Sequence, residues 1–320
     1  MRVSVKENSR FEEIKEYSVR NAHIGCYGYI TKGLENLSAI MPSDYSRLPL
    51  MSIGGNYIYR KNLRIQTPAL SVVNSWYSNF YHFIYETLIK IFCLRDYLPE
   101  TPIVFPTERS KFHDEWLSLL DIDNVILISN RQVVKTPLAI SCNNLTDDMR
   151  QKGQILRDFK EWVIEKMKTK GLIAGKEHYP EKLFITRSKA RFRRIVNNDE
   201  VLPIVRAMGY TVIELEDYSL AEQINFFYHA QKIAGAHGAG FSHMAFTQAS
   251  VLDIIVEGYE ADWFEKLAKT FDLSYISMRA KAILKRDESA ETAGHRDLWV
   301  DTSMLHKYLE ESKCGFVYKG

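Results

Sequence analysis

The sequence predicts a two-domain α/β protein. Short apolar runs of strand length alternate with longer runs of helical period along most of the chain, which is the pattern of a mostly parallel sheet covered by helices. The 320 residues correspond to two domains at the usual size of about 150 residues per domain. With 46% hydrophobic residues, the chain can bury cores of that size.

In the first half, the periodicity predicts helices and strands in alternation. Helices are expected over 78–98, 113–122 and about 150–168, and strands over 101–106 and 124–129. A polar, glycine-containing linker follows at 169–181, so the N-terminal domain is predicted to span 1–168. The first 70 residues give no clear assignment.

The second half alternates more regularly and predicts a doubly wound, Rossmann-like domain over 182–290. Ser219 and Glu222 form a capping box that starts one of its helices. A last helix, 301–313, lies in the remaining segment, 291–320, and is expected to pack back on the core. The predicted strands are 182–187, 211–215, 232–236, 251–256 and 274–278, and the predicted helices are 198–208, 219–230, 240–246 and 261–271.

Charge and cysteine content exclude several classes of protein. Lys and Arg number 42 and Asp and Glu number 40, so a net charge of +2 argues against a nucleic-acid-binding protein. The four scattered cysteines fit reduced structural thiols. The polar N-terminus has no signal-peptide pattern, and no apolar run reaches the roughly 20 residues of a membrane span. We therefore expect a cytoplasmic protein, with peripheral association at the inner face of the membrane left open.

The stretch Gly235-Ala236-His237-Gly238-Ala239-Gly240 stands where a predicted strand meets a predicted helix. Glycine is common in tight strand-to-helix turns without any ligand. The alternative is that an anionic ligand approaches the backbone and the free N–H groups of the next helix. The stretch follows the third strand of its domain, so it is not the dinucleotide fingerprint, and a nicotinamide-dependent enzyme is disfavoured.

An arginine-rich segment follows the first strand of the same predicted domain. Arg187, Lys189, Arg191, Arg193 and Arg194 place five cations within eight residues. Such a run can be a solvated loop. Its position at a strand's carboxyl end instead favours a diphosphate ligand, because the planar fork of arginine suits phosphate oxygens. Arg187 is the first choice for this contact, followed by Arg191 or Arg194.

Two further sets of polar residues carry possible chemistry. His82 and Glu86 lie four residues apart on one helical face, three residues after Asn79, and could form a general base with its orienting carboxylate. The alternative is an aromatic core helix with a polar edge. Glu257 follows an apolar strand and could accept hydrogen bonds from ribose, or simply stand at a helix start. Asp121 and Asp123 have the D-x-D spacing, but they lie in a turn, and no metal site is expected.

Together these motifs resemble the glycosyltransferases of family 61. The resemblance rests on the N-x-x-H-x-x-x-acidic helix within 74–90 and, within 182–259, on the arginine-rich segment, the H-G-A-G corner and the acidic residue after the next strand. It implies a GT-B type fold, in which two Rossmann-like domains face a cleft, and inverting transfer from a nucleotide-sugar. No cofactor and no metal are implied.

The resemblance also implies roles for individual residues. His82 and Glu86 become the candidates for the base, with the choice between them open, and Asn79 is placed on the acceptor side. Binding of the nucleotide-sugar falls to a set in the C-terminal domain: Arg187, Arg191, Arg194, His237, Gly238, Ala239, Gly240, His243 and Glu257. For His237, a purely structural role is the alternative.

The expected function is therefore transfer of a sugar from a nucleotide-sugar, most simply a UDP-sugar, to a hydroxyl of a glycan or glycolipid acceptor. In having no anchor, the sequence resembles bacterial enzymes that synthesise surface polysaccharides such as capsule or lipopolysaccharide, and we expect such a role. The alternatives are a non-catalytic nucleotide- or carbohydrate-binding protein and another Rossmann-type nucleotide enzyme. No nucleic-acid partner is expected, and assembly into a homo-oligomer is left open.

Overall fold

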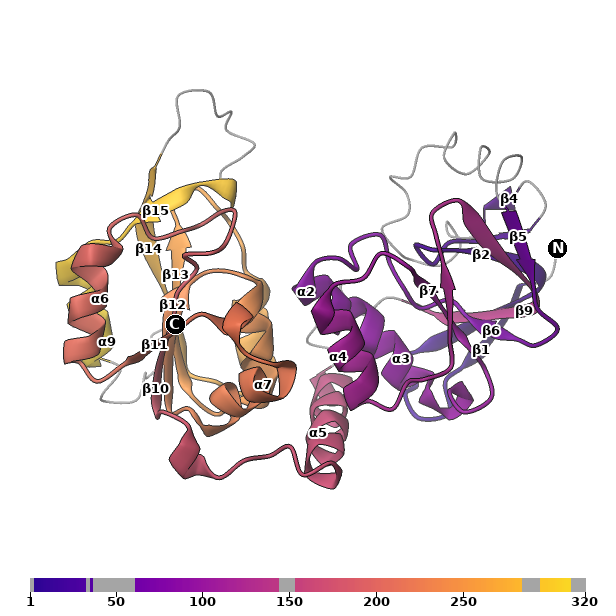
Figure 1. Cartoon of the computed structure of the whole chain (residues 1–320), viewed down its shortest axis with the longest axis horizontal. Coiled ribbons are helices and arrows are strands. Elements are labelled where there is room, and N and C mark those ends of the chain that lie inside the picture. The colour runs from indigo at the N-terminus through magenta and orange to yellow at the C-terminus, as the bar shows by residue number, and fades with distance from the viewer. Residues whose placement is uncertain (1–2, 33–34, 37–60, 144–152, 284–293, 312–320) are drawn as a thin grey trace. The chain divides into compact units, whose positions relative to one another are not determined.

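The computed structural model describes residues 3–32, 35–36, 61–143, 153–283 and 294–311. The chain divides into two compact units, Met1–Phe159 and Lys160–Gly320, each with its own sheet (Figure 1). The predicted α/β class is confirmed, since helices and strands alternate in both units. Within the described residues, no helix is long and apolar enough to span a membrane.

Unit 1 is built on a mixed sheet. Its strands are β1 (Val3–Glu7), β2 (Lys15–Gly25), β3 (Ile30–Lys32), β4 (Glu35–Asn36), β5 (Lys61–Arg64), β6 (Ala69–Leu70), β7 (Ile103–Pro106), β8 (Val125–Ile128) and β9 (Gln132–Cys142). They run in the order β4-β3-β2-β9-β6-β7-β8, with β1 paired to β2 and β5 paired to β9. The side from β9 to β8 is parallel, as expected, whereas β1 to β4 add an antiparallel side that the sequence did not predict.

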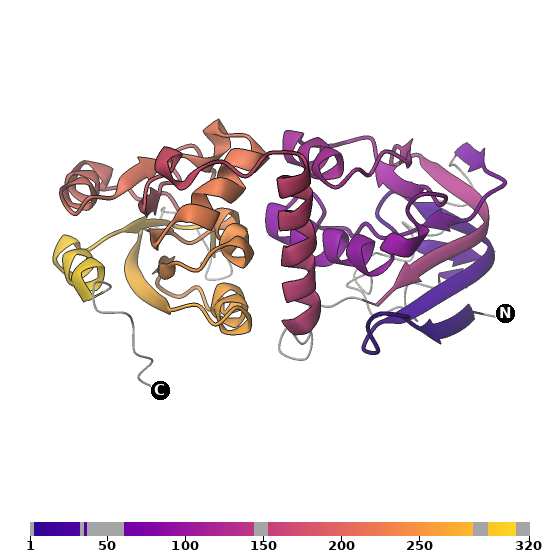
Figure 2. The ribbon, with the colours of Figure 1, turned by 90° about the horizontal axis from the view of Figure 1, so that it is seen from below.

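The long antiparallel pair β2–β9 joins the two sides of this sheet, and Figure 2 shows its strong twist. Its register runs from Glu16 opposite Cys142 to Gly25 opposite Val133. Pairing is interrupted at Asn21, whose φ is 52°, opposite Pro137. Proline has no N–H to donate to a strand ladder, so a local break in the pairing at this point leaves neither strand with a missing hydrogen bond inside the ladder.

One continuous helical stretch of unit 1 carries the predicted N-x-x-H-x-x-x-acidic motif. It consists of α2 (Phe80–His82), the π-helical turn η2 (Phe83–Leu88) and α3 (Ile89–Cys93). Every residue from Phe83 to Cys93 is buried, so the helix predicted at 78–98 is the central core helix of the unit. The remaining helices are η3 (Arg95–Tyr97), α4 (Lys111–Leu119) and α5 (Gly153–Thr169), the last of which continues into unit 2.

Unit 2 is doubly wound. Its strands are β10 (Lys182–Ile185), β11 (Thr211–Ile213), β12 (Lys232–Ala236), β13 (Ser250–Val256), β14 (Tyr275–Ile283) and β15 (Asp297–Trp299). The sheet order is β11-β10-β12-β13-β14-β15, parallel from β11 to β14, with β15 antiparallel at the edge. Taken along the chain, the parallel strands have the order 2-1-3-4-5, whose switch point lies between β10 and β12.

Helices cover both faces of the unit 2 sheet (Figure 1). Helices α6 (Asn198–Ala207) and α9 (Thr302–Glu311) pack together on one face, over a core of Phe184, Ala234 and Leu252. The other face carries α7 (Leu220–His229), the 3-10 helix η6 (Ala239–Phe246) and α8 (Trp263–Thr270). Short 3-10 turns lie at η4 (Lys176–His178) and η5 (Leu215–Asp217). The capping box predicted for Ser219 and Glu222 is present at the start of α7.

Candidate active site

In unit 1, His82 and Glu86 form a hydrogen-bonded pair. The Nδ1 atom of His82 lies 2.6 Å from Oε1 of Glu86. The Glu86 side chain is 3% exposed, whereas that of His82 is 32% exposed. A carboxylate beside Nδ1 accepts the proton of that nitrogen, so the tautomer with a lone pair on Nε2 is favoured. The pair therefore has the arrangement of a general base and its orienting carboxylate.

Neighbouring residues hold this pair in place. The Nδ2 group of Asn74 donates a hydrogen bond to the second carboxylate oxygen of Glu86, and Oδ1 of Asn74 accepts from the Trp76 N–H at 2.9 Å. The indole of Trp76 stacks on the His82 ring with 5.9 Å between centroids. One turn further along the helix, burial lowers the pKa of Lys90, while the thiol of Cys142 and the carboxylate of Glu86 oppose that shift. Asn74 and Trp76 were not predicted as site residues.

Asn79 begins the helical stretch that carries the pair. Its side-chain oxygen accepts a hydrogen bond from the Tyr81 N–H at 3.0 Å, which is an N-cap contact. Glu86 itself lies in the π-helical turn η2, and such turns occur frequently at functional sites. Asn79 thus sets where the helix starts and with it the direction in which His82 projects.

In unit 2, Arg187 and Gly238 meet at the switch point of the sheet. Arg187 follows β10 and Gly238 follows β12, and the two strands are neighbours in register, with Ile185 opposite Gly235. A Cβ atom on Gly238 would overlap the guanidinium of Arg187, so the absence of a side chain makes room for that cation. The φ of Gly238 is 173°, which is ordinary extended backbone. The arginine-rich segment and the glycine corner thus meet through Arg187 and Gly238.

Arg193 is the second cation of this corner, and the sequence did not single it out. Burial, and then the charge of Arg193, lower the pKa of Arg187 to about 10. The Nε atoms of Arg187 and Arg193 are both buried and find no hydrogen-bond partner within the described residues. Two guanidiniums whose charges act on each other and whose buried Nε donors are unused are the arrangement that an oxyanion such as a phosphate satisfies.

The other two predicted cations lie differently. Arg194 points to Asp297, with Nη2 2.7 Å from Oδ2, so its guanidinium is already engaged by a carboxylate. Arg191 is exposed, and its guanidinium lies 5.0 Å from the ring centroid of Phe192. Of the arginines proposed from the sequence, the structure brings only Arg187 against the glycine corner.

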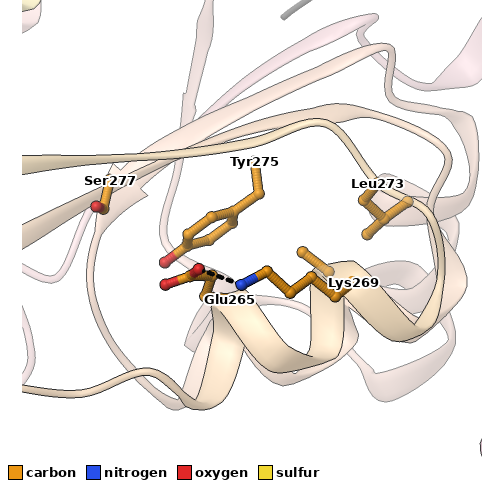
Figure 3. Close-up of a pocket in the computed structure, with 6 residues that line it drawn as sticks. Glu265, Lys269, Leu273, Tyr275 and Ser277 are labelled. Carbon is orange, nitrogen blue, oxygen red and sulfur yellow. Dashed lines mark hydrogen bonds and ion pairs between the residues drawn. The ribbon is translucent and has the colours of Figure 1, made fainter. Parts of the chain in front are cut away.

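His237 is fixed in the interior directly before that corner. Its Nδ1 atom lies 2.7 Å from Oδ2 of Asp253, and the ring packs against Tyr259 and Phe264. The Tyr275 hydroxyl donates to the same carboxylate oxygen at 2.8 Å. Figure 3 shows Tyr275 beside Glu265 and Lys269 of α8, at a pocket of about 180 Å³. Asp253 was missed, although it is the single charged residue of its strand, β13.

The remaining predicted residues of unit 2 divide into surface and interior. Ala239 and Gly240 are half-buried at the start of η6, and Glu257 is exposed at the carboxyl end of β13. His243 is fully buried, with Nε2 2.9 Å from Oε1 of Gln223. Burial lowers the pKa of His243 to about 3, so this ring is neutral and joins η6 to α7. A side chain without exposed surface does not line an open site, and we assign His243 a structural role.

The described residues contain no group of three His, Cys, Asp or Glu side chains that could hold a metal ion. Asp121, the first residue of the D-x-D spacing, lies in the turn between α4 and β8 with a φ of 56°. This is the turn that the sequence predicted for the motif.

A comparison with protein families finds one match, which includes residues of both units. The family model of glycosyltransferase 61 matches residues 80–252, more than half of the chain. The chain belongs to glycosyltransferase family 61. No curated protein gives a significant match to it. Within this family 61 chain, the matched region contains His82, Glu86, Arg187 and Gly238, whereas Asn74 and Asp297 lie outside it.

Proposed function

We propose that the protein is an inverting glycosyltransferase that moves a sugar from a UDP-sugar to a hydroxyl group of a glycan or glycolipid. Membership of family 61 supports transfer of a glycosyl group. The observation that carries the proposal is the corner of unit 2, where Arg187 and Arg193 offer unused buried donors beside Gly238. A diphosphate satisfies both guanidiniums at once.

On this proposal, unit 2 binds the donor. Arg187 and Arg193 bind the diphosphate, and the backbone N–H groups of Gly238, Ala239 and Gly240 face its oxygens at the start of η6. The location supports this assignment, because doubly wound sheets bind ligands at the carboxyl ends of strands beside the switch point. Glu257, exposed at the end of β13, is proposed to accept hydrogen bonds from the ribose.

Unit 1 supplies the base, and we propose that it is His82 rather than Glu86. The partly exposed ring of His82 can reach an acceptor hydroxyl, whereas Glu86 is buried and its two oxygens accept hydrogen bonds from Asn74 and His82. Nε2 of His82 takes the hydroxyl proton while the acceptor oxygen bonds to the anomeric carbon. The bond between that carbon and the diphosphate oxygen breaks on the opposite face, which inverts the configuration, and the leaving group keeps the electron pair.

The charge that develops on the departing diphosphate is stabilised by the two arginines. They supply two positive charges, which supports a metal-independent reaction. We further propose that the acceptor belongs to a bacterial surface polysaccharide and that the enzyme acts in the cytoplasm, at times against the inner face of the membrane. A GT-B arrangement of the two units stays a prediction.

A thermal-shift series tests the proposal. The purified protein is heated with UDP, GDP, CMP, TDP or NAD, with and without EDTA, because a ligand of the folded state raises the melting temperature. We expect a shift with UDP that survives EDTA and disappears in Arg187→Ala. Lys189→Ala is the matched control, since Lys189 is exposed and paired with Asp217. A shift with NAD alone contradicts the proposal, and a UDP shift without any transfer or hydrolysis favours a non-catalytic binding protein.

A further inference from the structure

A segment near the C-terminus, residues 294–300, lies against the arginine-rich loop that follows β10. The Leu298 N–H donates to the carbonyl oxygen of Arg194 at 2.9 Å, and the Val196 N–H donates to the carbonyl oxygen of Leu298 at 2.9 Å. Ile195 and Leu298 form a parallel bridge. The loop is thus paired with a strand that begins about 100 residues later in the sequence and lies outside the region matched by the family model.

Asp297 makes the strongest contact between the two segments. Its Oδ1 atom accepts the backbone N–H of Arg194 at 3.0 Å, and its Oδ2 atom accepts Nη2 of the same residue at 2.7 Å and Nε at 3.2 Å. The Asp297 side chain is 6% exposed. A buried carboxylate that binds both the backbone and the guanidinium of one arginine fixes that residue in a single conformation.

The residue before this contact is Arg193, which has an unusual backbone. Its φ is 58°, in the left-handed region that a residue with a side chain rarely adopts. Its guanidinium lies 5.4 Å from the ring centroid of Tyr259, and a Cβ atom on Gly294 would meet the same ring at 2.7 Å. The Phe192 ring, on the other side of Arg193 in the chain, lies 4.4 Å from the ring of His295. Arg193 is therefore held between two residues that both contact segment 294–300.

We infer that Asp297 is a positioning residue for the donor site. By fixing Arg194, it holds Arg193 in the left-handed conformation that keeps the Arg193 guanidinium beside Arg187. Two like charges repel each other, so the loop would otherwise relax and separate them before any ligand arrives. Holding them together in advance removes the cost of ordering the loop on binding. For the identity of the ligand, the inference rests on the proposed function. It also assigns Arg194 the carboxylate of Asp297 as its partner, in place of a phosphate.

The test uses the full-length protein with UDP and, as a second probe, inorganic pyrophosphate. We expect Asp297→Ala to weaken the binding of both by about tenfold or more, and Asp297→Asn to weaken it less, because its amide oxygen can still accept the Arg194 N–H. Asp301→Ala is the matched control. Asp301 lies in the same region and its Oδ1 accepts the Met304 N–H at 2.9 Å, so its loss lowers stability without touching the arginines.

Some results of these binding measurements overturn the inference. If Asp297→Ala leaves both affinities unchanged, Asp297 does not position the site. If it strengthens them, Arg194 is itself a ligand that Asp297 competes for, which also excludes the positioning role. If Asp301→Ala weakens binding as much as Asp297→Ala does, the effect is one of general stability.

A readout without ligand separates this inference from the proposed function. Arginine Nε–H signals in a ¹H–¹⁵N spectrum, assigned with Arg193→Lys and Arg187→Lys, report whether the two buried Nε groups stay protected from exchange with water. We expect both signals to lose protection in Asp297→Ala and to keep it in Asp301→Ala. Unchanged protection in Asp297→Ala overturns the positioning role. If protection is lost but the wild type binds neither UDP nor pyrophosphate, the positioning role stands and the proposed function fails.

Discussion

Nδ1 of His237 lies 2.7 Å from Oδ2 of Asp253, and both side chains are buried, at 4% and 0% exposure. His237 directly follows β12 and Asp253 lies in the neighbouring parallel strand β13, so the contact fixes the chain directly before Gly238. Of the two roles considered for His237, the interior position favours the structural one. The shape of the glycine corner therefore depends on a polar pair beneath it.

The first prediction concerns that pair. Replacing Asp253 by Ala removes the acceptor for both His237 and the Tyr275 hydroxyl. Each buried donor left without its acceptor typically costs about 1–3 kcal/mol, and this change leaves two. Tyr275→Phe removes a single hydrogen bond and should cost about 1 kcal/mol. Urea unfolding of the three proteins checks the order, and equal midpoints for wild type and Asp253→Ala would show that the pair is not a stabilising contact.

The second prediction concerns the glycine corner. Gly238→Ala places a methyl group where the Arg187 guanidinium lies, while the extended backbone at φ 173° accepts alanine. We expect the UDP-induced thermal shift to fall strongly, with the melting temperature of the unliganded protein changed little. The double variant with Arg187→Ala is the control, because both changes act on one guanidinium and their effects should not add. Additive losses would mean that Gly238 acts independently of Arg187.

The location of this site could be predicted from the sequence, but its contacts could not. The apolar runs at 251–256 and 232–236 predict strands, and their carboxyl ends predict where the site lies. The contact of Asp253 with His237 could not be predicted, because the two residues become neighbours only when two strands pair in register. Choosing between Arg193 and Arg194 needed the position of Asp297, about 100 residues away in the chain.

The unpredicted parts of unit 1 have a similar cause. Strand β9 contains Pro137 and several polar residues, so it lacks the continuous apolar run of a buried strand. Its partner β2 is also polar along much of its length, and the antiparallel pairing that stabilises both is non-local. The π-helical turn at Glu86 could not be predicted from the sequence, because a single turn is too short for its periodicity to be distinguished from that of an α-helix.

The third prediction divides the roles of His82 and Glu86. If His82 is the base and Glu86 orients it, His82→Ala should lower turnover by about 10²–10⁴-fold. Glu86→Gln should lower it less, by roughly 10–100-fold, because the amide oxygen can still accept from Nδ1 of His82. Neither change should alter the UDP-induced thermal shift, since both residues belong to unit 1. A larger loss for Glu86→Gln than for His82→Ala would make Glu86 the base.

The fourth prediction follows from the buried ring of His243. Burial lowers the pKa of His243 to about 3 in the folded protein, against about 6.5 in an unfolded chain. The unfolded state therefore binds one more proton than the folded state between these two values. Stability from the neutral ring is fully present above about pH 6.5 and is lost as the pH falls towards 3, by up to about 1.4 kcal/mol per pH unit.

Comparison with His243→Gln isolates this contribution, because a glutamine amide can still donate to Oε1 of Gln223 but does not titrate in this range. The free energy of unfolding should differ least between the two proteins at low pH, and the advantage of the wild type should grow as the pH rises to about 6.5 and then stay constant. Other titrating groups, such as the buried His113, are common to both proteins and cancel in the difference. A difference that does not change between pH 4 and 7 would mean that His243 keeps an ordinary pKa, and hence that water reaches η6 in the folded protein.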